Sequence, residues 1–159
     1  MTTPTKPVFV TGASGQLGRL VVSELLKKLP ADQIVAGVRD MGKAADLTAL
    51  GIQVRLADYD KPETLEQAFN GIGRLLLISS SEIGKRADQH LQVITAAENA
   101  GVDQLVYTSL LHADTSPMQL AQEHKITEKA LSESSVPSVV LRNGWYTENL
   151  LMAAPTAIE

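Results

Sequence analysis

The feature that most constrains the fold is a glycine-rich segment between an apolar run and a helical pattern near the N-terminus. Residues 8–26 read VFVTGASGQLGRLVVSELL, in which Gly12, Gly15 and Gly18 are spaced three residues apart. The β-branched run before Gly12 is typical of a strand, and the apolar residues after Gly15 recur at helical spacing until Pro30, which ends a helix. The segment therefore predicts a strand, a turn with few side chains, and a helix.

The rest of the chain repeats this alternation of strand and helix. Strands are predicted at about residues 7–11, 33–38, 52–57, 74–79, 104–109 and 138–142, and helical patterns at about residues 16–29, 42–50, 65–69, 87–97 and 118–134. In the helix over 87–97 the expected buried stripe is Ala87, Leu91, Ile94 and Ala97. Such regular alternation predicts an α/β fold of the Rossmann type. This is a doubly wound parallel sheet of about six strands, with right-handed crossovers and helices on both faces.

Composition excludes several classes of protein. The chain has 159 residues, enough for one domain that buries a core without disulfides. Its formal net charge of -4 argues against a nucleic-acid partner, and the absence of cysteine excludes disulfides, thiolate metal sites and thiol catalysis, so we expect no metal site. The N-terminus lacks the apolar core of a signal peptide, and no apolar run is long enough to span a bilayer. We therefore expect a cytoplasmic protein without membrane insertion, and the oligomeric state stays open.

In a doubly wound sheet, the turn after the first strand is where a dinucleotide pyrophosphate lies against the N–H groups that begin the first helix. Gly12 would permit the tight turn, Gly15 would let the backbone approach the phosphates, and Gly18 would let the helix pack against the sheet. The spacing G-x-x-G-x-x-G is one residue longer at its start than the common G-x-G-x-x-G. The alternative is a glycine-rich loop that binds no ligand. The flanking strand and helix favour the dinucleotide, so residues 1–159 are predicted to be one NAD(P)-binding domain.

The end of the second predicted strand bears on the choice of cofactor, because the residue there meets the adenosine ribose. An acidic residue would bind the 2′-hydroxyl of NAD, whereas this sequence has Arg39 followed by Asp40. A guanidinium suits a 2′-phosphate through bidentate, charge-assisted hydrogen bonds, so NADPH is the predicted cofactor. Two alternatives stay open. Arg39 is simply solvated, or Asp40 neutralises it or contacts the ribose itself.

Polar residues follow two further strands, at the edge where open α/β sheets bind ligands. Asp58, after the third strand, is a candidate to accept a hydrogen bond from the adenine amino group, and a turn-forming aspartate is the alternative. Ser79, Ser80 and Ser81, after the fourth strand, place small hydroxyls beside the ribose and the nicotinamide. Their alternative role is that of an ordinary flexible loop.

Five segments together resemble a known family: TGASGQLG, VRD, LLLISSSE, YTSLLHADTSP and LRNGWYTENLL. They are similar to the NmrA-like atypical short-chain dehydrogenase/reductases, and among these to the bacterial NAD(P)H:quinone oxidoreductases of the second type. The resemblance implies hydride transfer from NADPH to a small-molecule quinone. By motif matching it also implies cofactor contacts for Gly12, Ser14, Gln16 and Leu17 at the phosphates, Arg39 at the 2′-phosphate, Ser79, Ser80 and Ser81 along the cofactor, and Asn143, Gly144, Trp145, Tyr146 and Asn149 near the nicotinamide.

The sequence departs from ordinary short-chain reductases at the fifth predicted helix. Those enzymes carry a Tyr-x-x-x-Lys pair there, whereas this chain reads EHKITEK, with His124 and Glu128 one helical turn apart. His124 is a candidate proton donor near neutral pH, and a simple contact between His124 and Glu128 is the alternative. Of Tyr107 and Ser109 on the fifth strand, we expect only one to face the pocket, and we favour Ser109 as the second catalytic candidate.

Two adjacent aromatic residues, Trp145 and Tyr146, follow the sixth predicted strand. They predict an apolar wall on which a planar quinone stacks above the nicotinamide. The alternative is that both are aromatic residues of the core.

The resemblance also implies a longer protein, because related chains continue into a smaller C-terminal domain that covers the substrate. We therefore expect this chain, from which that substrate domain is apparently missing, to bind NADPH but to reduce quinones more slowly than a longer version. Two other functions stay open. One is a non-catalytic, NADP(H)-sensing NmrA-like protein that acts through partners. The other is a nucleotide-sugar or isoflavone-type reductase, which ranks last because such enzymes normally retain a catalytic lysine in the fifth helix.

Overall fold

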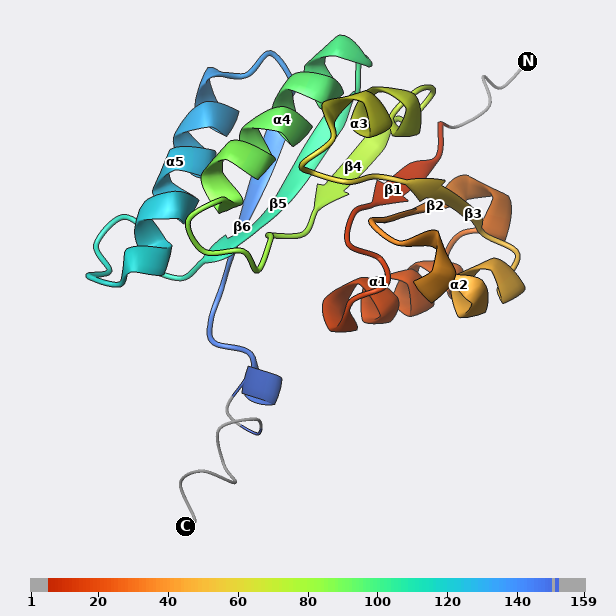
Figure 1. The fold of residues 1–159 in the computed structure, drawn as a ribbon, viewed down its shortest axis with the longest axis horizontal. Helices are drawn as coiled ribbons and strands as arrows, with labels where there is room; N and C mark the ends of the chain where they lie inside the picture. Colours follow the sequence, from red (N-terminus) through yellow and green to blue (C-terminus); the bar gives the residue numbers. More distant parts are fainter. Residues whose placement is uncertain (1–5, 150, 152–159) are drawn as a thin grey trace.

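Six parallel strands form a single sheet in the computed structural model, which describes residues 6–149 and residue 151 (Figure 1). The strands are β1 (Val8–Val10), β2 (Ile34–Val38), β3 (Gln53–Leu56), β4 (Arg74–Leu77), β5 (Gln104–Leu110) and β6 (Ser138–Asn143). Their order across the sheet is β3-β2-β1-β4-β5-β6, and every neighbouring pair is parallel. The predicted parallel sheet is confirmed, and the strand order reverses between β1 and β4.

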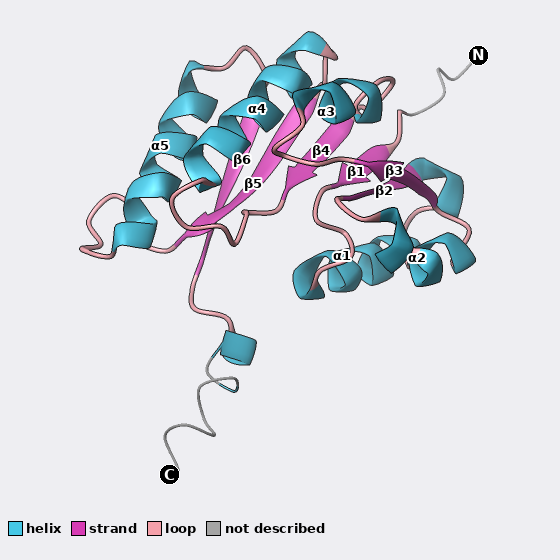
Figure 2. Cartoon of the chain, viewed as in Figure 1, coloured by secondary structure: helices cyan, strands magenta, loops and turns pink. Residues whose placement is uncertain are grey.

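Helices cover both faces of the sheet, as predicted (Figures 1 and 2). They are α1 (Gln16–Leu26), α2 (Ala45–Ala49), α3 (Pro62–Ala68), α4 (Arg86–Asn99) and α5 (Gln119–Glu133), with 3-10 turns at Ala31–Gln33 and Met41–Lys43. Figure 1 shows α1 and α2 on one face, and α3, α4 and α5 on the other. The helix predicted over residues 42–50 is divided into a 3-10 turn and the short α2. Among the helices that the structure describes, none combines the length and the apolar character needed to cross a membrane.

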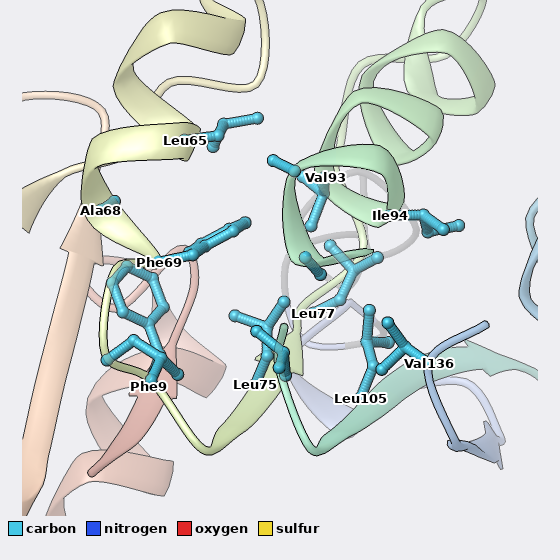
Figure 3. Packing of buried hydrophobic residues seen from close by; sticks show 14 of the residues in the cluster. Phe9, Leu65, Ala68, Phe69, Leu75, Leu77, Val93, Ile94, Leu105 and Val136 are labelled. Carbon is cyan, nitrogen blue, oxygen red and sulfur yellow. The ribbon is translucent and has the colours of Figure 1, made fainter. Parts of the chain in front are cut away.

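The core is divided by the sheet into two layers. Phe9 and Val10 are neighbours on β1 and point to opposite faces, and both are fully buried. On the side of α3 and α4, the Phe9 ring packs edge-on against Phe69, with 5.1 Å between the ring centroids. Leu75 and Leu105 belong to the same cluster, as Figure 3 shows. Central strands are thus buried from both sides, as their continuous apolar runs predict.

Gly37 in the middle of β2 makes room for an aromatic ring. A Cβ at Gly37 would lie 2.3 Å from Cε1 and 2.5 Å from Cζ of Phe9. Phe9 is fully buried and packs against Phe69, so its ring can move only by disturbing its neighbours. The glycine is therefore required by packing, which the sequence pattern did not indicate.

Helix α4 differs from the prediction in the residues that it buries. The expected stripe included Leu91, which is 38% exposed. Three polar residues, Arg86, Gln89 and His90, are instead at most 4% exposed. Apolar spacing could not reveal them, because a polar side chain is buried only where partners from other elements satisfy it.

Gly37→Ala should lower the free energy of unfolding by about 1–3 kcal/mol, the usual cost of overpacking a well-packed core. The added methyl group has to displace the Phe9 ring and so disturbs its contact with Phe69. Urea unfolding followed by circular dichroism measures the change. Gly144→Ala is the matched control, because a Cβ there meets nothing within 4 Å. An equal loss in the two variants would contradict the packing role of Gly37.

Candidate functional site

A cavity of about 280 Å3 lies at the C-terminal ends of strands β1 to β4. This is the point at which the strand order reverses, where open α/β sheets bind dinucleotides. Among the described residues its walls are formed by Gly12, Ser14, Gly15, Arg39, Ala57, Asp58, Tyr59, Ile78, Ser79, Ser80, Ser81, Glu82 and Gln89. The edge of the sheet that the sequence predicted for a ligand is therefore the edge that carries the cavity.

The turn after β1 is shaped by its three glycines. Gly12 has a φ of +57°, a left-handed conformation that other residues rarely adopt. A Cβ at Gly18 would lie 2.3 Å from the carbonyl oxygen of Gly12, so a side chain there would force α1 away from the end of β1. Gly15 is the N-cap of α1 and supplies no side-chain cap, which leaves the first N–H groups of the helix available to a ligand. The tight turn at Gly12 and the close packing at Gly18 are confirmed.

The other residues predicted at the phosphates are divided between the cavity and the helix. Ser14 lines the cavity, and its carbonyl oxygen accepts a hydrogen bond from Arg19 Nε at 3.0 Å, which holds the turn against α1. Gln16 and Leu17 lie in the first turn of α1, outside the residues that line the cavity. A phosphate contact through their backbone N–H groups stays a prediction.

Arg39 lines the cavity from the end of β2. Its side chain is 67% exposed and forms an ion pair with Glu82, from the segment after β4. Asp40 has a different partner, because its Oδ1 accepts a hydrogen bond from the Gly42 N–H at 2.9 Å and caps the following 3-10 turn. The residue that neutralises Arg39 is therefore Glu82 and not Asp40, and Arg39 is not simply solvated.

Asp58, at the end of β3, is a turn-forming aspartate that also lines the cavity. Its Oδ1 accepts a hydrogen bond from the Asp60 N–H at 3.1 Å. Tyr59 beside it lines the cavity too, and its hydroxyl lies 2.6 Å from Thr11 Oγ1. Burial raises the pKa of the Tyr59 phenol above its ordinary value, so this wall of the cavity is uncharged at Tyr59. A contact between Asp58 and adenine stays a prediction.

The segment Ser79–Ser81 follows β4 and lines the cavity, and hydrogen bonds join it to α4. The Ser80 N–H donates to His90 Nε2 at 2.9 Å, and the Ser80 carbonyl oxygen accepts from Arg86 Nε at 2.5 Å. The Ser80 hydroxyl donates to the Gln89 side chain. Three contacts at one residue argue against the flexible-loop alternative.

A buried polar network behind this segment joins α4 to α5. Arg86 Nη1 and Glu123 Oε2 form a buried ion pair at 2.7 Å, and His90 Nδ1 lies 2.9 Å from Thr127 Oγ1. Burial, together with the positive charge of Arg86, lowers the pKa of His90 to about 3. His90 is therefore neutral at pH 7, which is the form in which its Nε2 can accept the Ser80 N–H.

His124, the predicted proton donor, is part of the protein interior and does not line the cavity. Its Nδ1 lies 2.6 Å from the Tyr107 hydroxyl oxygen, so its hydrogen-bond partner is on β5 and is not Glu128. Burial and the nearby charge of Arg86 lower the pKa of His124 to about 4. The imidazole is therefore uncharged near neutral pH, and a proton-donor role for His124 stays a prediction.

Ser109, the second catalytic candidate, also contacts α5. Its hydroxyl donates to Glu128 Oε1 at 2.6 Å, and Glu128 Oε2 lies 2.7 Å from Arg142 Nη2. Tyr107 and Ser109 are two residues apart on β5 and therefore share a face, from which both reach α5. The expectation that only one of them faces the pocket was wrong, because residues at this spacing point the same way and neither lines the cavity.

The residues predicted near the nicotinamide begin with Asn143, the last residue of β6, and lie outside the cavity. Figure 1 shows this part of the chain leaving the sheet beyond β6. Asn143 Nδ2 donates to the Tyr146 hydroxyl at 3.0 Å, and the Asn149 N–H donates to the Tyr146 carbonyl oxygen at 3.0 Å. Trp145 is 55% exposed and Tyr146 40% exposed, so neither is a core residue within the part of the chain that the structure describes. Gly144 lies in this segment, whose contact with nicotinamide stays a prediction.

Five residues that line the cavity were not identified from the sequence: Ala57, Tyr59, Ile78, Glu82 and Gln89. The first three adjoin predicted strand ends, and that position is the signal by which they could have been found. Glu82 and Gln89 lie further along the chain. Glu82 lies in the segment between β4 and α4, and Gln89 lies in α4. Both reach the cavity because α4 packs beside β4, which no sequence pattern indicates.

A glycine turn at the reversal of strand order, with a cation at the end of β2, defines a Rossmann-type dinucleotide-binding domain. Comparison with known families agrees, because residues 12–155 match a family described as NAD(P)H-binding. The chain belongs to this NAD(P)H-binding family.

Known proteins are similar to the chain over nearly its whole length. Quinone oxidoreductase 2 of Escherichia coli K12 is 56% identical over 152 residues, which are 96% of this chain and 53% of that protein. The crystal structure of the E. coli NADPH-dependent quinone oxidoreductase QOR2 complexed with NADPH has a TM-score of 0.90, covering 94% of this chain and 53% of that chain. An NmrA-like family domain-containing oxidoreductase of Aspergillus flavus is 29% identical, over 92% of this chain and 54% of that protein. The predicted resemblance is confirmed, and the chain spans about half the length of the curated relatives it matches.

Lowering the pH below about 6.5 should destabilise the fold through His90 and His124. Their pKa values in the folded state, about 3 and about 4, lie below that of an unfolded histidine, so the unfolded state binds protons that the folded state does not. Each histidine should therefore remove about 1.4 kcal/mol of unfolding free energy per pH unit as the pH falls between its two pKa values. Urea unfolding between about pH 7.5 and pH 5.5 measures this slope.

Replacing each buried histidine in turn shows how much it contributes to the dependence of the unfolding free energy on pH. His90→Gln and His124→Gln should each make the dependence of stability on pH less steep. His112→Asn, which replaces an exposed histidine, is the control and should keep the wild-type slope. A wild-type slope in both buried-histidine variants would show that other groups cause the acid destabilisation.

Proposed function

We propose that this chain binds NADPH at the C-terminal edge of its sheet and transfers hydride from it to a small-molecule quinone. One observation carries the proposal: a cavity at the reversal of strand order whose walls combine the glycine turn with Arg39. The similar E. coli protein is an NADPH-dependent quinone oxidoreductase that was crystallised with NADPH, which supports the same cofactor and acceptor here. This chain covers 53% of that protein.

The adenosine half and the pyrophosphate fit the side of the cavity formed by β1, β2 and β3. The pyrophosphate would lie at the bare start of α1, where a Cβ at Gly15 would already approach the Gly12 carbonyl oxygen to 3.3 Å. Arg39 would bind the 2′-phosphate through two parallel hydrogen bonds. Asp58 lies in the cavity wall beyond β3, within the part of the site that the adenine would occupy.

The nicotinamide half would extend over the ends of β4, β5 and β6, since a dinucleotide spans the two halves of such a sheet. Ser79–Ser81 lie at the end of β4 inside the cavity. We assign the segment Asn143–Asn149 to the outer part of this half of the site. Trp145 and Tyr146 are exposed aromatic residues of that segment, on which a planar quinone can stack.

When bound, NADPH supplies the hydride, and the protein contributes position and the exclusion of water. The second hydrogen of the hydroquinone comes from solvent, because His124 lies outside the cavity and is uncharged near neutral pH. A quinone accepts hydride readily, so no tyrosine with a lowered pKa has to protonate its oxygen. The absence of a Tyr-x-x-x-Lys pair is consistent with this chemistry.

Stopped-flow oxidation of NADPH with and without a small benzoquinone tests the proposal. The chain should bind NADPH and oxidise it when the quinone is added. Gly15→Val should abolish binding, because the side chain blocks the approach of the pyrophosphate, while the far-UV circular dichroism spectrum stays unchanged. Binding without oxidation would instead support the NADP(H)-sensing alternative. A chain that does not bind NADPH would contradict the proposal.

Arg39→Ala should weaken the binding of NADPH by about 1.5–3 kcal/mol, the range for a hydrogen bond to a charged group, and should affect NADH far less. The reason is that only NADPH carries the 2′-phosphate. Isothermal titration calorimetry with each cofactor measures the difference. Arg74→Ala is the matched control, because Arg74 is exposed at the start of β4, at the opposite edge of the sheet. Equal weakening of the two cofactors by Arg39→Ala would exclude a 2′-phosphate role.

A further inference from the structure

The guanidinium that we assign to the 2′-phosphate has a partner of its own in the structure. Arg39 Nη1 and Glu82 Oε1 form an ion pair, and both residues line the cavity. Arg39 follows β2 and Glu82 follows β4, the two strands that flank β1, and the residues are 43 positions apart in the sequence. The ion pair therefore spans the part of the sheet edge over which a dinucleotide would lie.

Glu82 is anchored by its main chain and by a second cation. Its N–H donates to Ser80 Oγ at 3.2 Å, and its carbonyl oxygen accepts from the Arg86 N–H at 2.9 Å in the turn before α4. Its second carboxylate oxygen, Oε2, lies 3.7 Å from Lys85 Nζ. The Glu82 side chain is 31% exposed and that of Arg39 67% exposed. The main chain of Glu82 is thus held in the wall of the cavity, and its carboxylate is the less exposed member of the pair.

We propose that Glu82 sets the preference between NADPH and NADH by competing with the 2′-phosphate for Arg39. This inference rests on the proposed binding of NADPH in the same cavity. A phosphate monoester carries a charge of about -1.5 to -2 near neutral pH, so it binds the guanidinium by displacing the Glu82 carboxylate from it. NADH has a hydroxyl at this position and binds with the ion pair intact. Glu82 therefore lowers the affinity for NADPH alone and reduces the discrimination that Arg39 would otherwise provide.

Glu82→Gln tests this role, because it removes the charge and keeps the size of the side chain. The Kd of NADPH should fall about two- to fivefold, the equivalent of one exposed ion pair, and the Kd of NADH should stay unchanged. The gain should shrink at high salt, since interactions between exposed charges are screened. Calorimetric titration of the purified chain with each cofactor, at low and at high sodium chloride, measures both quantities.

Two controls show whether the effect runs through Arg39. Glu133→Gln removes another paired, exposed carboxylate, 3.8 Å from Lys129 at the end of α5, and changes the net charge by the same amount. It should leave the Kd of NADPH at the wild-type value. In the Arg39→Ala background, Glu82→Gln should bring no gain, because the carboxylate then has no guanidinium to occupy.

Several results would overturn the role of Glu82 while the proposed function stands. They are an unchanged Kd of NADPH in Glu82→Gln, an equal gain for NADH, an equal gain in Glu133→Gln, or a gain that persists without Arg39. A wild-type chain that binds neither cofactor would overturn the proposed function, and the inference with it. The wild-type titrations thus separate the two failures.

Discussion

The start of α1 touches the end of β1 at Gly18, and the position of the whole site depends on this contact. A Cβ at Gly18 would lie 2.3 Å from the Gly12 carbonyl oxygen and 2.6 Å from Ala13 Cα, so a side chain there would push the helix away. Glycine keeps the N-terminus of α1 at the edge of the sheet, over the reversal of strand order between β1 and β4. The ends of β2, β3 and β4 surround it, because parallel strands with right-handed crossovers bring their C-terminal ends to one edge.

The other wall of the cavity depends on buried polar contacts between helices. Arg86 is paired with Glu123 of α5 and also donates to the Ser80 carbonyl oxygen. A buried ion pair is weak evidence for stability, because desolvation of both charges offsets their attraction. We therefore infer that the ion pair serves mainly to hold Arg86 where it can bind the Ser80 carbonyl oxygen. His90 contacts Thr127 of α5, and in its neutral form it also accepts the Ser80 N–H. Arg86 and His90 therefore link the position of the segment after β4 to the packing of α4 against α5.

The parts of the site that follow from strand ends could be predicted, and the parts that depend on side-chain partners could not. Arg39 and Asp58 were placed in the cavity by the rule that strand ends gather at one edge. The spacing of His124 and Glu128 suggested a contact between the two along α5, yet the hydrogen-bond partner of His124 is Tyr107 on β5. Spacing along a helix says which residues share a face. It does not say what that face contacts, and burial by those contacts sets the pKa.

The sequence by itself determined the order of strands and helices, the parallel sheet, the bare turn at Gly12 to Gly18, and the edge of the sheet that carries the cavity. These follow from periodicity and from backbone sterics, which act between near neighbours in the chain. Only the tertiary structure decided that Arg39 pairs with Glu82, that Ser80 is held by α4, and that His90 and His124 are uncharged. Each of these depends on side chains or charges from different elements, and their distances and burial exist only once the sheet has placed β2 and β4 on either side of β1 and the helices have packed over them.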